Sequence, residues 1–297
     1  MSKNSKKEEN SFILNFLCDF NELKYSFQEI SFNKSFDKNI VEENIQLIKQ
    51  KRYAISDDIW NIKEKENHQF LISLLELIGQ YVNEFKNDIE KISKIFKEDI
   101  SFSKEFILNI LTNKQKKISE FIRNESLSLD FLTFYAIFAA YPYRESVSQL
   151  VHTKEKIEEH ISGFCPICGH WPGMSYIDKK EGQKLMACIC CGSIWSFRRL
   201  RCSFCHSADK DKLGYLNIEG EEAISAYTCD ICRRYVKTKN ISKHEAEISE
   251  VTILNDYMSS SNIDIAALQN KYLQEWIIGT RFDGPKDVRI GEYLKNS

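Results

Sequence analysis

Eight of the ten cysteines in this chain occur as four CxxC pairs inside one segment of 68 residues. The pairs are Cys165/Cys168, Cys188/Cys191, Cys202/Cys205 and Cys229/Cys232. One CxxC pair offers two thiolates from a single tight turn, and two turns that face each other form a tetrahedral Cys₄ site. The four pairs therefore predict two metal sites, around which the rest of the fold has to be organised.

The composition is that of an ordinary soluble protein of 297 residues, with 42% hydrophobic and 28% charged residues. A formal net charge of −2 disfavours a dedicated nucleic-acid-binding protein, which is usually strongly basic. We expect no membrane span, because the longest apolar run, 131–141, is too short. The Lys- and Glu-rich start lacks the pattern of a secretory signal, so we expect a cytoplasmic protein. Cytoplasmic thiols are kept reduced, which favours metal binding over disulfides.

The first 160 residues are predicted to be helical, because they contain one proline, Pro142, and one glycine, Gly79. Apolar residues recur every three or four positions over 67–96, 39–51 and 103–111, which is typical of amphipathic helices. Ser128 is the expected N-cap of a buried helix, and Pro142 is expected to start or kink the next one.

Short strands and glycines replace the helices after residue 160. We expect strands at 184–187, 194–198, 214–218 and 235–238, and a last helix within 242–279. That helix carries one apolar face, formed by Ile263, Ala267, Leu268 and Tyr272. The predicted domains are a helical domain (1–160), a first Cys₄ module (161–198), a second Cys₄ module (199–241), and a C-terminal helix and tail (242–297).

The first two cysteine pairs are separated by 19 residues, within the usual range for a zinc ribbon. Gly169 and Gly192 directly follow these pairs and permit the positive φ that closes each turn. The last two pairs are separated by 23 residues, and His206 and Arg233 stand where glycine is expected. Pairing in sequence order is favoured over interleaved pairing, because each ribbon is then a local hairpin with a low closure entropy.

Four thiolates suit either Zn²⁺ or a single iron ion of the rubredoxin type, so we expect one Fe or Zn ion per site. No coordination position remains for a substrate, which disfavours hydrolytic zinc catalysis. We expect Cys190 to be a small buried residue outside the ligand set, and Cys18 to be packed in the core of a helix bundle. His170 and His206 follow cysteine pairs, but the eight cysteines already complete both tetrahedra.

A basic cluster and two aromatic residues near the cysteine pairs also need an interpretation. Arg198, Arg199 and Arg201 form either a solvated face or a patch that docks an acidic partner surface. On an alternating strand, Arg199 and Arg201 would share one face. Trp195 and Tyr235 are expected to lie in the ribbon core, because small modules bury aromatic residues where they can.

The order of CPICG, CICCGSIW, RLRCSFC, LGYL and CDICRRYVK resembles the formate dehydrogenase accessory protein FdhE family. The resemblance lies in 160–240 and includes the eight paired cysteines, Trp195, Arg201, Tyr215 and Tyr235-Val236-Lys237. It implies a multidomain fold of α plus small β class: a helical N-terminal bundle, two tandem rubredoxin-like or zinc-ribbon Cys₄ modules, and a C-terminal helix. His206 and Arg233 depart from the family pattern, which has glycine at these positions.

The resemblance also implies a function. Members of this family are not enzymes; they bind the catalytic subunit of a molybdenum- or tungsten-dependent formate dehydrogenase in the cytoplasm, and that enzyme needs them to become active. Iron in the Cys₄ sites and redox-sensitive partner binding are further implications. The sequence leaves three alternatives open: a rubredoxin-like electron-transfer protein, a nucleic-acid-binding zinc ribbon, and a homodimer rather than a monomer.

Overall fold

A computed structural model describes residues 3–28, 31–50, 52–157, 162–178, 182–218, 223–241 and 248–274. The chain divides into two compact units. The first is built mainly from Met1–Leu47 and Ala54–Glu155, and the second mainly from Lys156–Trp276. The four domain ranges given above stay a prediction.

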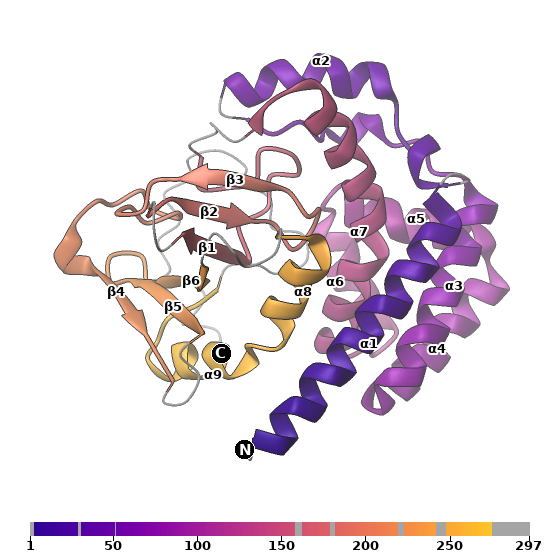
Figure 1. Ribbon diagram of the computed structural model, residues 1–297. Helices are drawn as coiled ribbons and strands as arrows, with labels where there is room; N and C mark the ends of the chain where they lie inside the picture. Colours follow the sequence, from indigo (N-terminus) through magenta and orange to yellow (C-terminus); the bar gives the residue numbers. More distant parts are fainter. Residues whose placement is uncertain are drawn as a thin grey trace. The chain divides into compact units, whose positions relative to one another are not determined.

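The first unit is helical, as expected (Figure 1). Its α-helices are α1 (Lys3–Gln28), α2 (Lys38–Lys49), α3 (Glu64–Tyr81), α4 (Lys86–Glu98), α5 (Ile100–Leu111), α6 (Gln115–Asn124) and α7 (Leu129–Lys154). Short 3₁₀ turns lie at Phe32–Lys34, Asp57–Ile59 and Asn83–Phe85. Among the helices in the described ranges, none has the length and hydropathy needed to cross a bilayer.

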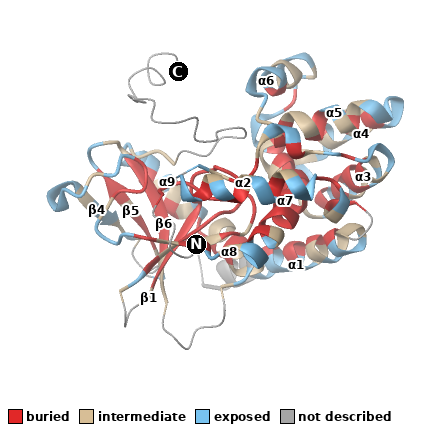
Figure 2. Cartoon of the chain, turned by 90° about the horizontal axis from the view of Figure 1, so that it is seen from above, coloured by how far each residue is buried: buried red, intermediate tan, exposed pale blue. Residues whose placement is uncertain are grey.

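Helix α7 is the most buried helix of this unit. Most of its residues from Phe131 to Ser148 are buried, as the red ribbon at α7 in Figure 2 shows. The Ser128 hydroxyl accepts a hydrogen bond from the backbone N–H of Phe131, which confirms the predicted N-cap. Pro142 lies inside the helix, so 129–154 is one element rather than two.

The apolar stripe over 67–96 belongs to two helices and not to one. Helix α3 ends at Tyr81, and Val82 has an extended backbone with φ −123° and ψ 91°. One 3₁₀ turn then leads into α4. No proline marks this break, and the nearest glycine, Gly79, lies inside α3. The stripe keeps its spacing across the break, so the sequence pattern predicts a single helix there.

The second unit contains a six-stranded sheet in the order β3-β2-β1-β6-β5-β4. Its strands are β1 (Met174–Asp178), β2 (Lys184–Ala187), β3 (Ile194–Phe197), β4 (Leu213–Leu216), β5 (Ile224–Cys229) and β6 (Arg234–Ile241). All neighbouring pairs are antiparallel except β1 and β6, which are parallel. The four predicted strands are present, and β1 and β5 are additional. Because β1 pairs with β6, the two cysteine-rich segments form one continuous sheet.

Two helices, α8 (Glu250–Met258) and α9 (Ser261–Gln269), follow the sheet where one was predicted. Ile263 and Ala267 of α9 are buried in a small core with Ala226 and Tyr235. Leu268 was predicted on the same face, but 62% of its surface is exposed. The rest of the predicted range, 242–247 and 275–279, lies outside the described residues.

Candidate metal centres

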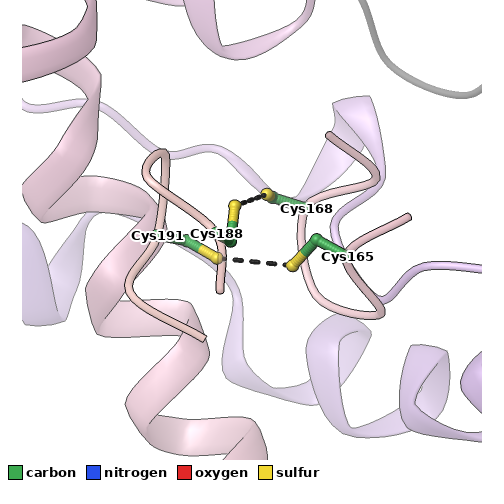
Figure 3. A group of neighbouring side chains, drawn as sticks. All are labelled: Cys165, Cys168, Cys188 and Cys191. Carbon is green, nitrogen blue, oxygen red and sulfur yellow. Dashed lines mark hydrogen bonds between the residues drawn. The ribbon is translucent and has the colours of Figure 1, made fainter. Parts of the chain in front are cut away.

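The first two cysteine pairs converge on one point (Figure 3). Cys165 and Cys168 come from one turn, Cys188 and Cys191 from a second, and their side chains point toward each other. The Sγ atoms of Cys165 and Cys191 are 3.5 Å apart, as are those of Cys168 and Cys188. All four cysteines are buried.

The last two pairs repeat this arrangement at a second centre. The Sγ atoms of Cys202 and Cys232 are 3.6 Å apart, and those of Cys205 and Cys229 are also 3.6 Å apart. Cys202 and Cys229 are buried, whereas Cys205 and Cys232 are partly accessible to solvent. The pairs therefore meet in sequence order at both centres, and the second centre is the more open one.

Both groups have the geometry that a tetrahedral ion requires. In each group the four sulfur atoms lie within 4.8 Å of one another. A zinc–sulfur bond of about 2.3 Å places the sulfurs of a regular tetrahedron about 3.8 Å apart. The shortest contacts here, 3.5–3.6 Å, are near that value and far longer than the bond of about 2 Å in a disulfide. None of the eight paired cysteines is in a disulfide, so each group could hold one metal ion.

The four cysteine turns use the same backbone hydrogen bond. The N–H of the residue that follows each pair donates to the carbonyl of the first cysteine, at 2.8–3.1 Å. That residue has a positive φ in every case: 77° at Gly169, 73° at Gly192, 58° at His206 and 56° at Arg233. His206 and Arg233 thus adopt the conformation that glycine adopts most readily. The missing glycines do not change the form of the second centre.

At Arg233, side-chain contacts accompany this unfavourable backbone. Its guanidinium donates to the carbonyls of Lys271 and Asn270, at 3.3 Å and 2.6 Å, and to Asp230 at 2.8 Å. It also lies 3.9 Å from the centre of the Tyr272 ring. These contacts connect the last cysteine turn to the segment after α9, and they offset part of the strain of a positive φ.

Local contacts favour thiolate at one cysteine of each group. Burial alone would raise the pKa of Cys168, but contacts with Cys165, Cys188 and Cys191 lower it well below its ordinary value. The contact with Cys232 lowers the pKa of Cys202 to about 5, and the backbone N–H of Phe204, 3.4 Å from its sulfur, acts in the same direction. Burial raises the pKa of Cys205 to about 11. A proton must therefore leave the Cys205 thiol when a metal binds.

Aromatic residues surround both centres. Trp195 is fully buried, and its indole N–H donates to the carbonyl of Ser162 at 3.0 Å. Tyr235 is also buried, so both predicted core residues are confirmed. The ring centres of Trp171 and Phe204 are 5.2 Å apart and connect the first cysteine segment to the third turn. The cysteine spacing gives no sign of this contact, because it depends on how the two segments pack.

The other cysteines and the histidines lie outside the two groups of four. Cys190 is buried beside Cys191, as predicted. Cys18 was predicted to lie in the core, but it is exposed on α1, so this prediction was wrong. His170 is buried, and its Nδ1 has no hydrogen-bond partner among the described residues. Arg199 and Arg201 line a pocket that Arg198 does not line.

No family model matches the chain. It is similar to curated proteins called Protein FdhE homolog. The one from Aquifex aeolicus is 26% identical over 160 residues, 53% of this chain and 54% of that protein. The one from Stutzerimonas stutzeri is 37% identical over 85 residues, 27% of each chain. The one from Haemophilus influenzae (strain PittGG) is 30% identical over 95 residues, 31% of each chain. The chain thus spans about half the length of the first of these relatives, and less of the others.

A solved structure described as the crystal structure of the FdhE protein from Pseudomonas aeruginosa has a similar fold. The TM-score is 0.57, and the match covers 96% of this chain and 98% of that one. Sequence identity in this match is 14%, so it establishes similarity of fold only. The sequence matches and the fold together confirm the predicted resemblance to the FdhE family, and the predicted fold class with them.

Proposed function

We propose that this chain is an accessory protein of a formate dehydrogenase. It binds the catalytic subunit of a molybdenum- or tungsten-dependent formate dehydrogenase in the cytoplasm, and that enzyme needs it to become active. One observation carries the proposal: four cysteine turns in the FdhE-like order close into two Cys₄ groups on one sheet. The similarity to proteins called FdhE homologues supports it.

The metal centres would be structural. Their proposed ligands are the eight paired cysteines: Cys165, Cys168, Cys188, Cys191, Cys202, Cys205, Cys229 and Cys232. Four protein ligands fill a tetrahedral ion completely, which leaves no position for a substrate. In structural sites of this kind the binding energy of the metal contributes directly to folding. A protein that works by binding, and not as an enzyme, fits this chemistry.

The metal is proposed to be iron or zinc, one ion in each centre, because tetrahedral thiolate sites accept both. The purified protein distinguishes them directly. Elemental analysis should give two metal ions per chain. Iron centres should colour the protein red, whereas zinc centres should leave it colourless.

The proposed partner is tested by a pull-down in which the tagged chain captures the catalytic subunit of formate dehydrogenase. The experiment is done under reducing and under oxidising conditions, because the resemblance implies redox-sensitive binding. Capture under at least one condition is expected. Absence of association under both conditions would contradict the proposal.

A matched pair of variants tests whether partner binding depends on the first metal centre. Cys168→Ser removes one sulfur from the first group, whereas Cys190→Ser changes a neighbouring buried cysteine outside that group. The first variant should lose capture of the partner and the second should keep it. Equal capture by both variants would show that partner binding does not depend on the first metal centre.

A second candidate function is electron transfer. It is favoured by the partial exposure of Cys205 and Cys232, which would bring an ion in the second centre close to solvent. A red protein that is reduced and reoxidised reversibly would support this function. A colourless zinc protein would exclude it.

A further inference from the structure

A pocket of about 210 Å³ lies beside the second metal centre. It is bounded by β4, β5, the turn before Cys202 and the start of β2 and β6. Four of its lining residues are basic: Lys184, Arg199, Arg201 and Arg234. None of the lining residues that the structure describes is acidic. Two metal-centre cysteines, Cys202 and Cys229, form part of one wall.

Lys184 is the unusual member of this set. It is the first residue of β2, and only 3% of its surface is exposed. Its Nζ lies 5.4 Å from the centre of the Tyr227 ring, and no ion pair joins it to a carboxylate in the described parts of the chain. A buried cation is costly unless an opposite charge compensates it. Burial lowers the pKa of Lys184 to about 8, in agreement with this incomplete compensation.

The arginines reach the pocket because of the local backbone. Strand β3 ends at Phe197, and a turn then carries Arg199 and Arg201 to the pocket and leaves Arg198 outside it. Gly182 has φ +66°, and a Cβ atom there would lie 2.9 Å from Nη1 of Arg199. The Arg199 guanidinium therefore lies close to the Gly182 backbone. Arg234 is held over the Phe204 ring, 5.6 Å from its centre.

The neighbouring metal centre accounts for only part of this positive charge. A divalent ion with four thiolates has a net charge of about −2. The described lining of the pocket has four cationic side chains and no acidic one, so the lining is positively charged beside this centre. A phosphate monoester carries about −1.5 to −2 charges at neutral pH and three acceptor oxygens, which match arginine forks. A carboxylate carries only about half that charge, so a phosphate monoester matches the basic pocket better.

Two tyrosines form the outer part of the pocket. Tyr215 of β4 and Tyr227 of β5 are directly opposed across the strand pair, and their ring centres are 6.5 Å apart. Tyr215 is 67% exposed, which is unusual for a large aromatic residue in a strand. An exposed ring beside a basic pocket can pack against the planar organic part of an anionic ligand.

We propose that this pocket binds a phosphate monoester that carries an aromatic ring. The phosphate contacts Lys184, Arg199 and Arg201, and the ring packs against Tyr215. The site shares a wall with the second sulfur group but does not depend on the proposed partner, so the pocket and the partner proposal can fail independently.

Isothermal titration calorimetry on the metal-loaded full chain, in a phosphate-free buffer, tests the site. The probes are phenyl phosphate, inorganic phosphate, phenol, benzoate and a single-stranded oligonucleotide. Phenyl phosphate should bind about tenfold more tightly than inorganic phosphate, and phenol should not bind. No heat from phenyl phosphate at millimolar concentration would overturn the proposal. Equal binding of benzoate, or tighter binding of the oligonucleotide, would also overturn it.

Variants locate the site. Arg199→Ala and Lys184→Met should each weaken the binding of phenyl phosphate about tenfold or more. Arg198→Ala is the matched control, because it removes a neighbouring arginine that does not line the pocket, and it should bind like the unchanged protein. Tyr215→Ala should weaken the binding of phenyl phosphate but not of inorganic phosphate. The metal content of each variant shows whether it is folded. If a folded Arg199→Ala variant bound phenyl phosphate as tightly as the unchanged protein, the proposal would be overturned.

Discussion

The side-chain hydroxyls of Ser175 and Thr238 lie 2.7 Å apart in a hydrogen bond between β1 and β6. The two residues are register partners in the parallel strand pair, and both are fully buried. This bond therefore lies where the segment of the first metal centre meets the segment of the second. We therefore expect a change that disrupts one segment to reach the other through this strand pair.

Thr238→Val should destabilise the second unit by about 1–3 kcal/mol, because it leaves the buried Ser175 hydroxyl without this partner. Urea unfolding measures the change. The double variant Ser175→Ala/Thr238→Val should lose less free energy of unfolding than the two single variants lose in sum. Ser196→Ala is the control, because it removes an exposed hydrogen bond with Gln183. It should change the free energy of unfolding by less than about 0.5 kcal/mol. Strict additivity of the two single changes would show that this hydrogen bond does not couple the strands.

Cys168→Ser should lower the metal content from two ions to one and destabilise the whole sheet, because β1–β6 are continuous. Elemental analysis and thermal unfolding measure the two effects. Cys190→Ser should keep both ions, since Cys190 is buried but outside the group. If Cys168→Ser kept two ions and an unchanged melting temperature, Cys168 would not be a ligand.

A chelator should remove the metal of the second centre before that of the first. All four cysteines of the first group are buried, whereas Cys205 and Cys232 are partly exposed. Release into excess chelator should therefore have a fast and a slow phase of equal amplitude. Cys205→Ser should abolish the fast phase and Cys168→Ser the slow one. A single phase for the unchanged protein would contradict this order.

Acidification should release metal from the second centre, whose cysteines are the more accessible ones. Only the thiolate binds metal, and burial raises the pKa of Cys205 to about 11, so a proton already competes with the metal for this sulfur at neutral pH. This competition grows as the pH falls, and the affinity for the metal is lost in that direction. Ultrafiltration followed by elemental analysis at pH 4–8 measures the release. If the protein retained two ions at pH 4, this prediction would be wrong.

In the helical unit, Lys24→Met should cost about 3–5 kcal/mol of stability, because it leaves Glu145 as a buried charge without this ion pair. The Lys24 and Glu145 side chains are 1% and 6% exposed, and Nζ of Lys24 is 2.9 Å from Glu145. Replacing both by apolar residues should cost much less. The exposed pair Lys117–Glu105 is the control, and Lys117→Met should change stability by less than about 1 kcal/mol. A small effect at Lys24 would mean that water reaches Glu145.

The sequence by itself determined the features that depend on short spacing. The two groups of four sulfurs, their pairing in order and the Ser128 cap are all present where the sequence predicts them. Each depends on residues that are close in the chain, where turn geometry and helical period leave few alternatives. The break at Val82 and the exposed Leu268 show the limit of such patterns, since an apolar stripe does not reveal where its helix ends or what covers it.

Only the tertiary structure decided how the two cysteine segments combine. The parallel pairing of β1 with β6 joins residues about 60 positions apart, as in Ser175 and Thr238. No local pattern encodes that pairing, because its stability comes from hydrogen bonds and burial that exist only after the segments meet. For the same reason, the sequence gives Lys184 and the arginines as separate charges, and only the folded sheet gathers them around one pocket.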